Sequence, residues 1–369
     1  MRVALVHDYL LNYGGAERVL SALCKIYPEA DIFTLLYDEK LSKYFPKDKV
    51  KTSFLDGLPY FLKKNHKFLL PLLPIAVESF DLSDYDIVIS SSSVFAKGVV
   101  TNPGTVHICY CHSPARFLWD YNERYLKDEK NNALFKPFIK YLIHKARIWD
   151  RSSSERVDVW IANSKVTQER IKKYYKKDAV VIHPPVKSLN CRRNDLKIRD
   201  YFLVVSRLSP YKKIDLIINA FNELGLPLVV VGGGRDKKRL QMFAENNIVF
   251  TDFVPDAELA CYYQNCKAFV MAQEEDFGIA PLEAMNFGKP VLAYKRGGAE
   301  EWLKEGVNGE FFLEQTKESL KKGIEKIEES ISKYDKNKIR ESATGFNFEI
   351  FKEKIENIVS QNMDKKNDA

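Results

Sequence analysis

Short apolar runs rich in β-branched residues alternate with amphipathic segments of helix length along the whole chain. Near-continuous apolar runs predict strands that are buried on both faces, and the helical segments between them predict parallel sheets covered by helices. The sequence therefore indicates an α/β fold of the doubly wound type. The expected strands are Val3–His7, Asp31–Leu36, Ile87–Ser91, Val106–Cys111, Val157–Ala162, Val180–His183, Tyr201–Ser206, Leu228–Val231, Ile248–Thr251, Ala268–Met271 and Val291–Tyr294.

The length of 369 residues exceeds that of an ordinary single domain. The alternation pauses between Pro184 and Asp200, where two prolines precede a polar, charged stretch. Such a stretch is typical of a linker between domains. We therefore expect two Rossmann-like domains of similar size, residues 1–186 and residues 200–345.

The composition excludes several classes of protein. Hydrophobic residues make up 45% and charged residues 29%, which is typical of a folded chain and not of a disordered one. The longest apolar run, Phe68–Val77, has ten residues, contains two prolines and is too short to cross a bilayer. Met1–His7 reads directly as a strand and not as a signal peptide. The six irregularly spaced cysteines then predict reduced thiols and a cytoplasmic protein.

Positive charge is concentrated in the first half of the chain. Residues 1–190 hold 29 Lys and Arg against 21 Asp and Glu, whereas residues 191–369 hold 28 against 29. An excess of one sign in one half suggests that the halves meet different partners, such as an anionic membrane surface, and an ordinary solvated surface stays open as the alternative because charge alone does not choose between them. No motif typical of nucleic-acid recognition is present, so we expect no nucleic-acid partner.

Two basic segments with aromatic residues interrupt the alternation. In Asp56–Phe80, which contains Lys63, Lys64 and Lys67, an interfacial helix on anionic lipid and an ordinary surface helix both stay open. In Phe135–Arg151 we favour an ordinary amphipathic helix whose aromatic residues belong to the core.

Two motifs follow expected strands and open helices. Gly14-Gly15-Ala16-Glu17-Arg18 allows close approach of the backbone to a ligand, and the amides at a helix start attract phosphate. A tight strand-to-helix turn requires glycine as well, so this pair alone is weak evidence. In Ser206-Arg207-Leu208-Ser209-Pro210-Tyr211-Lys212-Lys213, Arg207 and Lys212 would lie at the carboxyl edge of a parallel sheet and suit a diphosphate, although single surface cations are common.

The most specific motif runs from Glu275 to Met285. It places two glutamates, Glu275 and Glu283, eight residues apart around a glycine that precedes an expected helix. Carboxylates accept hydrogen bonds from sugar hydroxyls, and the free amides at Gly278–Ala280 can face a phosphate. Two solvated helical glutamates are a weaker interpretation, because Glu283 lies on an apolar stretch and a buried glutamate requires a partner.

A single histidine, His112, follows the strand that ends in Cys109-Tyr110-Cys111. A lone histidine is more often structural than catalytic, but the end of a strand is where ligands of such folds bind. Cys109 and Cys111 point to opposite faces of a strand and cannot share one metal ion. No Asp-x-Asp or HExxH motif is present, so we expect no metal site.

Taken in order, these motifs resemble the retaining glycosyltransferases of family 4. The resemblance covers nearly the whole chain and also includes Asn163-Ser164, the Gly232–Gly234 run and Gly297-Gly298-Ala299-Glu300-Glu301. It implies a GT-B fold, in which two Rossmann-like domains face each other across a cleft. It also implies that the last helix, residues 346–361, crosses back to the first domain.

The resemblance also assigns roles to residues. Arg207 and Lys212 would hold the donor diphosphate, and His112 and Glu275 would contact the sugar, so that these four residues are the expected catalytic set. The donor would further contact Gly14, Gly15, Phe253, Val254, Phe277, Gly278, Ile279, Ala280 and Glu283, with Glu283 on the ribose and Phe253–Val254 near the base. Family members usually have glycine after the phosphate-binding lysine, where this chain has Lys213, so the division of that role between Lys212 and Lys213 stays open.

The run from His112 to Asp120 is similar to bacterial GDP-mannose-dependent mannosyltransferases. The expected enzyme is a retaining, metal-independent hexosyltransferase without a cofactor. It would move mannose from GDP-mannose to a lipid-linked glycan or polysaccharide acceptor at the inner face of the cell membrane. Fixed cations would stabilise the negative charge that develops on the leaving diphosphate. A sugar-nucleotide epimerase of the same fold, another donor such as UDP-glucose, and a basic binding module without catalysis are the alternatives.

Overall fold

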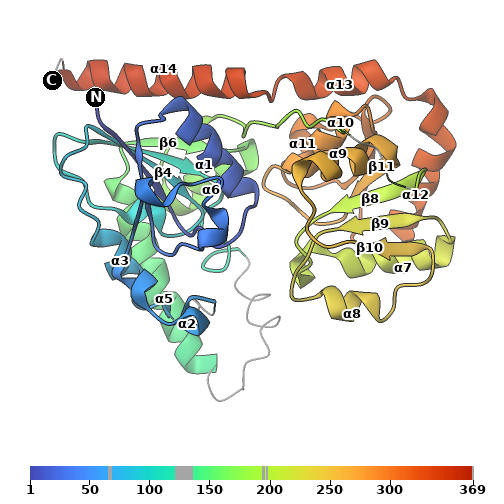
Figure 1. The fold of residues 1–369 in the computed structure, drawn as a ribbon, viewed down its shortest axis with the longest axis horizontal. Coiled ribbons are helices and arrows are strands. Elements are labelled where there is room, and N and C mark those ends of the chain that lie inside the picture. Colours follow the sequence, from blue (N-terminus) through green and yellow to red (C-terminus); the bar gives the residue numbers. More distant parts are fainter. Residues whose placement is uncertain (65–68, 121–135, 193–195, 197, 368–369) are drawn as a thin grey trace. The chain divides into compact units, whose positions relative to one another are not determined.

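The computed structural model describes residues 1–64, 69–120, 136–192, 196 and 198–367 (Figure 1). The chain divides into two units. The first comprises Met1–Pro185 and Glu349–Ala369, and the second comprises Val186–Phe348. Each unit is built around its own parallel sheet, which confirms the predicted pair of Rossmann-like domains.

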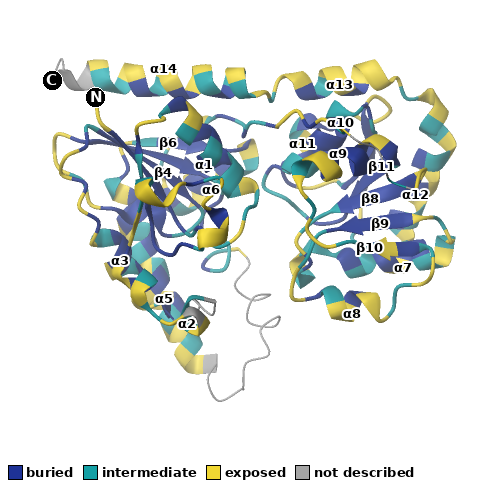
Figure 2. Ribbon diagram, in the orientation of Figure 1, coloured by how far each residue is buried: buried dark blue, intermediate teal, exposed yellow. Residues whose placement is uncertain are grey.

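The sheet of the first unit has seven parallel strands in the order β3-β2-β1-β4-β5-β6-β7. All residues of β1, β4 and β5 are buried, as Figure 2 shows, because helices cover both faces. The strands are β1 Val3–His7, β2 Asp31–Thr34, β3 Val50–Thr52, β4 Ile87–Ser92, β5 Val106–Cys111, β6 Val159–Ala162 and β7 Val180–Val181. The helices are α1 Gly15–Ile26, α2 Tyr60–Lys64, α3 Leu73–Glu78, α5 Lys136–Ser153, α6 Lys165–Tyr175 and α14 Phe348–Asn367.

The sheet of the second unit has six parallel strands in the order β10-β9-β8-β11-β12-β13. Alternate residues of β8 enter different cores, Tyr201 and Leu203 on one face and Phe202 and Val204 on the other. The strands are β8 Tyr201–Val205, β9 Leu228–Val231, β10 Ile248–Phe250, β11 Cys266–Met271, β12 Val291–Tyr294 and β13 Gly309–Phe312. The helices are α7 Ile214–Leu224, α8 Lys237–Gln241, α9 Asp256–Asn265, α10 Ile279–Asn286, α11 Ala299–Trp302, α12 Lys317–Ser330 and α13 Lys336–Thr344.

The last helix, α14, belongs to the first unit from Glu349 onward. Phe351 is buried there, with its ring centroid 5.8 Å from that of Tyr110 on β5. Phe346, expected to lie on the same helix, instead precedes α14 and packs against Phe277 in the second unit, with ring centroids 5.4 Å apart. Phe351, and not Phe346, thus makes the aromatic contact between the last helix and the sheet of the first unit.

Two of the structural predictions are wrong. The aromatic residues of α5 are not all core, because Phe138 and Tyr141 are 60% and 54% exposed. Helical periodicity identified the amphipathic helix but not which of its faces is buried. Phe135, from the same predicted segment, and Lys67, from the other basic segment, lie outside the described residues.

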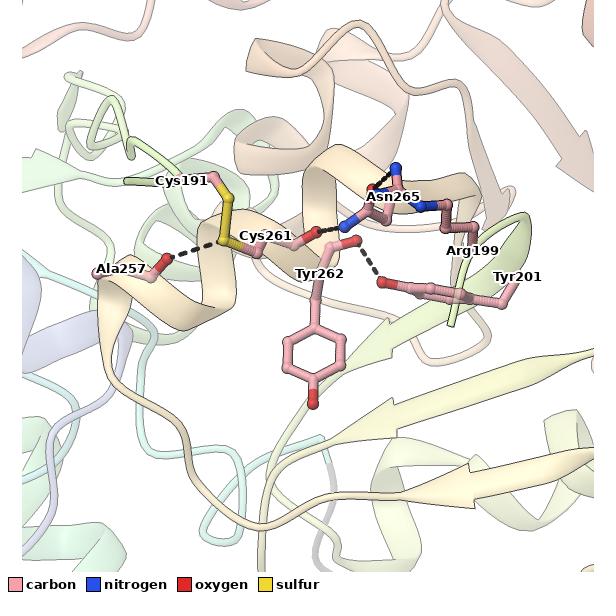
Figure 3. The surroundings of a disulfide bond; sticks show 7 residues. All are labelled: Cys191, Arg199, Tyr201, Ala257, Cys261, Tyr262 and Asn265. Atoms are coloured by element: carbon pink, nitrogen blue, oxygen red, sulfur yellow. Dashed lines mark hydrogen bonds between the residues drawn. A yellow bond between two sulfur atoms is a disulfide. The ribbon is translucent and has the colours of Figure 1, made fainter. Parts of the chain in front are cut away.

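The second error concerns the cysteines, which were all expected to be reduced. Cys191 and Cys261 form a disulfide, shown in Figure 3, with Cα atoms 4.8 Å apart. Cys191 lies in the predicted linker and Cys261 on α9, and a separation of 70 residues gives no pairing signal in the sequence. The argument from reduced thiols to a cytoplasmic location therefore fails.

Candidate functional site

The predicted ligand-binding residues of the second unit come from loops at one edge of its sheet. Because the strands are parallel, the loops that follow β8, β9, β11 and β12 all leave at the carboxyl edge. These loops contain Arg207–Lys213, Gly232–Gly234, Gln273–Gly278 and Lys295–Gly298. The structure thus collects motifs that are separated by up to ninety residues of sequence.

Lys212 and Glu275 form an ion pair at this edge. The Glu275 carboxylate also accepts a hydrogen bond from Gln273 Nε2 at 2.8 Å. Burial acts to lower the pKa of Lys212, but the adjacent Glu275 carboxylate outweighs it and the pKa is raised. The predicted phosphate-binding cation and the predicted sugar-binding carboxylate are therefore in contact, and Lys212 is held in its charged form.

Glu275 is positioned by the loop after β12. Gly298 N donates to Glu275 O at 2.9 Å. A Cβ atom on Gly297 would lie 2.3 Å from Glu275 O, and Gly297 has a φ of +77°, so only glycine fits this close approach. The glycine pair of the Gly297–Glu301 motif thus supports the backbone that carries Glu275.

Arg207 lies on the loop after β8, and its guanidinium donates to Tyr211 Oη at 3.3 Å. Lys213 follows Lys212 with a φ of 55°, in the left-handed region. Glycine adopts that region without steric cost, which explains physically why a glycine is common at this position in the resembling family. Lys213 is also the N-cap residue of α7.

The Glu275–Met285 motif provides backbone amides at the start of α10 and buried side chains that pack in the core. Gly278 caps α10 with a φ of +91°, and α10 begins at Ile279. Phe277 is 3% exposed and packs in the core, so its ring does not face a ligand. Glu283 is 2% exposed and accepts a hydrogen bond from Tyr263 Oη at 2.9 Å. The partner that a buried glutamate requires is thus Tyr263.

Phe253 and Val254, predicted near the base, follow β10 and precede α9. Phe253 is 63% exposed, whereas Val254 packs against the core. Because β10 runs parallel to β9 and ends at Phe250, Phe253 also follows the carboxyl edge of the sheet. An exposed aromatic ring there is available for stacking.

In the first unit, the glycine pair forms the start of α1. Gly14 is the N-cap residue, and its amide donates to Glu17 Oε2 at 2.8 Å in a capping box. The Gly14 amide is therefore already hydrogen-bonded to Glu17, and the exposed Gly15 is the first residue of the helix. The predicted phosphate contact through Gly15 agrees with this geometry better than one through Gly14.

His112 lies directly after β5, at the carboxyl edge of the first sheet. Its Nε2 lies 2.8 Å from Ser91 Oγ, and its backbone amide donates to Ser92 O at 2.9 Å. Burial, aided by the neighbouring His7, lowers the pKa of His112 to about 3, so its imidazole is neutral.

Several residues at this edge were missed by the sequence analysis. His7 approaches Ser91 and Glu17, and Asp8 accepts backbone hydrogen bonds from four consecutive residues, Ser93 to Ala96, at 2.5 to 3.0 Å. The signal was available, because His7 and Asp8 are polar residues at the end of an apolar strand.

Among the described residues, no group of three or more His, Cys, Asp or Glu side chains could hold a metal ion, and metal independence stays a prediction.

Comparison with known proteins fits this arrangement. A family model described as Glycosyltransferase Family 4 matches residues 13–188, and one described as Glycosyl transferases group 1 matches residues 192–344. The chain belongs to glycosyltransferase family 4. The predicted family and the predicted GT-B fold are both confirmed.

The relatives of this family 4 glycosyltransferase include mannosyltransferases. An uncharacterized glycosyltransferase of Methanocaldococcus jannaschii is 23% identical over 336 residues, 88% of this chain and 87% of the relative. The alpha-1,3/1,6-mannosyltransferase ALG2 of Candida glabrata is 25% identical over 369 aligned positions, 82% of this chain and 77% of the relative. A GDP-mannose-dependent phosphatidylinositol monomannoside mannosyltransferase of Mycolicibacterium smegmatis is 32% identical over 144 residues, 34% of this chain and 38% of the relative.

Solved structures match over the whole chain. Sucrose-phosphate synthase from Thermosynechococcus elongatus superposes with a TM-score of 0.71 at 15% identity, covering 99% of this chain and 100% of the other. Anabaena HepE in complex with UDP superposes with a TM-score of 0.67 at 19% identity, covering 98% and 100%. At these identities the likeness shows the fold alone.

Proposed function

We propose that this glycosyltransferase is a retaining hexosyltransferase that transfers mannose from GDP-mannose to a lipid-linked glycan or polysaccharide acceptor in cell-surface glycan synthesis. The observation that carries the proposal is the Lys212–Glu275 pair at the carboxyl edge of the second sheet, with Arg207 on the same loop as Lys212. Two cations and one carboxylate at that edge support the proposal, because ligands of such sheets bind there.

The chemistry of transfer requires this combination. Breaking the bond between a sugar and a diphosphate leaves negative charge on the diphosphate, and fixed cations stabilise that charge in the transition state. Arg207 offers a planar, bidentate donor set and Lys212 a compact charge. Glu275 would accept hydrogen bonds from sugar hydroxyls, and the amides at Gly278–Ala280 would face the distal phosphate.

The choice of donor rests on the relatives. Curated mannosyltransferases are similar over parts of the chain or at low identity, and one of them is described as GDP-mannose-dependent. Solved neighbours of the same fold hold UDP or UDP-glucose, so UDP-glucose is the competing donor. A panel of GDP, UDP and ADP sugars in a thermal-shift assay separates these, since a ligand that binds the native state raises its stability.

The catalytic assignment is tested by donor hydrolysis and transfer with Arg207→Ala and Glu275→Ala. We expect each variant to lose at least a hundredfold in kcat, the loss usual for removal of a group that stabilises transition-state charge. Arg239→Ala is the matched control, because Arg239 lies on α8 of the same unit and its guanidinium pairs with Asp236, the residue before that helix. Full activity of both site variants would refute the assignment, and epimerised nucleotide sugar without an acceptor would indicate an epimerase.

Contact with an anionic membrane is part of the proposal, and α5 supports it. Phe138, Tyr141 and Ile148 are more than half exposed on this helix, beside the exposed Lys140 and Lys145. Exposed aromatic and aliphatic residues interleaved with lysines are typical of interfacial helices. Among the described helices, none is long and apolar enough to cross a membrane.

The other basic segment supports membrane contact less. Phe61 and Ile75 are exposed there, but Lys63 forms an ion pair with Asp56 at 2.8 Å. Binding to vesicles containing anionic phospholipid tests the choice. Lys140→Glu with Lys145→Glu should abolish binding and leave hydrolysis of a soluble donor unchanged, whereas Lys354→Glu on α14 should leave binding unchanged. Binding that is indifferent to the α5 changes would refute the membrane contact.

A further inference from the structure

A row of polar side chains leads from the start of α1 to the imidazole of His112. Glu17 Oε1 lies 3.6 Å from His7 Nε2, His7 Nδ1 lies 3.1 Å from Ser91 Oγ, and Ser91 Oγ lies 2.8 Å from His112 Nε2. We call these four residues the Glu17–His112 relay. No step of the reaction described above uses its first three members.

The sheet itself builds the relay. His7 and Ser91 are direct partners in the parallel register of β1 and β4, and both are buried. β5 pairs with β4 on its other side and brings His112 next to Ser91. The backbone of His112 is fixed at both its amide, by Ser92 O, and its carbonyl, by Thr167 Oγ1 at 3.3 Å. The relay is therefore a rigid arrangement and not an incidental contact of mobile side chains.

The single hydrogen of the Ser91 hydroxyl links the protonation of the two histidines. If Ser91 donates to His7 Nδ1, it accepts from His112 Nε2–H, and His112 Nδ1 then carries a lone pair. If both nitrogens of His7 are protonated, His7 Nδ1–H donates to Ser91, Ser91 donates to His112 Nε2, and His112 Nδ1 carries the hydrogen. In both arrangements the Glu17 carboxylate favours a hydrogen on His7 Nε2.

We propose that Glu17, His7 and Ser91 are positioning residues that set the tautomer of His112, so that one proton on His7 decides whether His112 Nδ1 accepts or donates a hydrogen bond. Within the part of the chain that the structure describes, Nδ1 of His112 makes no hydrogen bond, so it is the atom available to a sugar hydroxyl. That use of Nδ1 rests on the proposed function, whereas the coupling of the histidines does not.

The environment of His7 is consistent with this role. The groups around it are Glu17 from α1, His112 after β5, Ser91 from β4, its register partner Thr34 on β2, and Asp8, the next residue of the chain. The turn at residues 96–98, which carries Lys97, also contacts β1. Asp8 is bonded by four amides and the Lys97 ammonium donates to Asp150 at 2.5 Å, so both charges are already paired. Glu17 is the acid within ion-pair distance of the imidazole.

The neighbouring residue on β4 supplies a matched control. Ser90 Oγ lies 2.8 Å from Nε2 of His107, which is buried like Ser91 and its partner. Nδ1 of His107 lies 3.3 Å from Arg156 O and must donate to it, so His107 is the Nδ1–H tautomer. Ser90→Ala therefore removes a buried serine–histidine bond outside the relay, whereas Ser91→Ala removes the bonds to both His7 and His112.

The test is a long-range ¹⁵N–¹H spectrum of the full chain labelled at its six histidines, recorded across pH, because such spectra separate the two tautomers and the charged ring. We expect neutral His7 to occur with Nε2–H of His112 and charged His7 with Nδ1–H, and the two signals to change together. Ser91→Ala should uncouple them, Ser90→Ala should not, and Glu17→Gln should alter the populations of the two arrangements together. The opposite pairing, independent changes, or coupling that survives Ser91→Ala would overturn the proposal.

Kinetics provide a second readout. Ser91→Ala should lower kcat about tenfold, the factor that corresponds to one net hydrogen bond, with the KM for donor unchanged. Ser90→Ala should leave both constants near the wild-type values. If no donor supports transfer, the proposed function fails, yet the spectra still decide whether the relay exists.

Discussion

Lys212 and Glu275, 63 residues apart in the sequence, form an ion pair at the carboxyl edge of the second sheet. In this arrangement the Glu275 carboxylate is paired with Lys212, the cation that a donor diphosphate would bind. Under the proposed function, nucleotide binding would therefore compete with Glu275 for Lys212, or share it.

That competition predicts opposite effects of Glu275→Gln on binding and on turnover. Loss of the carboxylate frees Lys212 and removes a like charge near the diphosphate, so the affinity for GDP should rise roughly threefold to tenfold, a gain of about 1 kcal/mol. Turnover should fall, because the sugar contact is lost. Titration calorimetry measures the affinity for GDP, and steady-state transfer measures the turnover.

The control is Glu223→Gln, which removes a carboxylate paired with Lys317 and Lys321 outside the site. It should change neither the affinity for GDP nor the turnover. Weaker GDP binding by Glu275→Gln would contradict the competition.

Lys213→Gly should stabilise the second unit. Lys213 has a φ of 55°, which costs a non-glycine residue about 1–2 kcal/mol, and glycine relieves most of it at a smaller entropic cost. A net gain of about 1 kcal/mol raises the midpoint of thermal unfolding by about 2–4 °C in a domain of this size. Lys213→Ala leaves a non-glycine residue in the left-handed region, so it should not raise the midpoint of thermal unfolding. An equal increase in both variants would mean that the lysine side chain, and not its backbone, is unfavourable.

Acid should destabilise the first unit through its buried histidines. Burial lowers the pKa of His107 to about 4, so between pH 6.5 and 4 the unfolded chain binds a proton there that the folded chain does not. The free energy of unfolding should therefore decrease as the pH falls through this window, by about 3 kcal/mol from His107. Urea unfolding from pH 7.5 to 4.5 measures the slope. His107→Gln should reduce the slope without abolishing it, because buried His112 contributes in the same window, and His144→Gln, at an exposed position on α5, should leave it unchanged.

The disulfide predicts a specific thiol count. Without reduction, the denatured protein should expose four thiols, those of Cys24, Cys109, Cys111 and Cys266, and after reduction six. Reduction should lower the free energy of unfolding of the second unit by up to about 4 kcal/mol, the loop-closure value for the 70-residue separation. Cys191→Ser should remove the difference between oxidised and reduced samples, whereas Cys266→Ala should preserve it. Six thiols without reduction would show that the bond is absent.

The sequence was sufficient for the parts of the fold that repeat a strong pattern. Central strands such as Val106–Cys111 have the predicted bounds, because strands buried on both faces are nearly continuous runs of apolar residues. The edge strands β3 and β13 were missed. Val50–Thr52 is mostly exposed and contains a lysine, and Gly309–Phe312 begins with glycine, so neither carries an apolar run.

The site was predicted where motifs follow strands and missed where single side chains meet across strands. Arg207 and Lys212 were expected at the carboxyl edge because they follow a strand, and the resemblance assigned Glu275 to the same donor. The approach of His7 to Ser91 depends instead on strand order, β1 next to β4, which no local pattern specifies. The disulfide and the exposed face of α5 were missed for the same reason, since both depend on tertiary packing.

The carboxylate of Asp8, which takes the amides of residues 93–96, has a consequence for local dynamics. Loops at the ligand-binding edge of α/β domains ordinarily exchange their amide hydrogens rapidly, because those amides bond to water. Here four successive loop amides are bound to one buried acid at the end of the first strand, and deuterium should enter them as slowly as it enters the sheet. This segment of the edge should therefore stay in one backbone conformation while loops whose amides bond to water open and close.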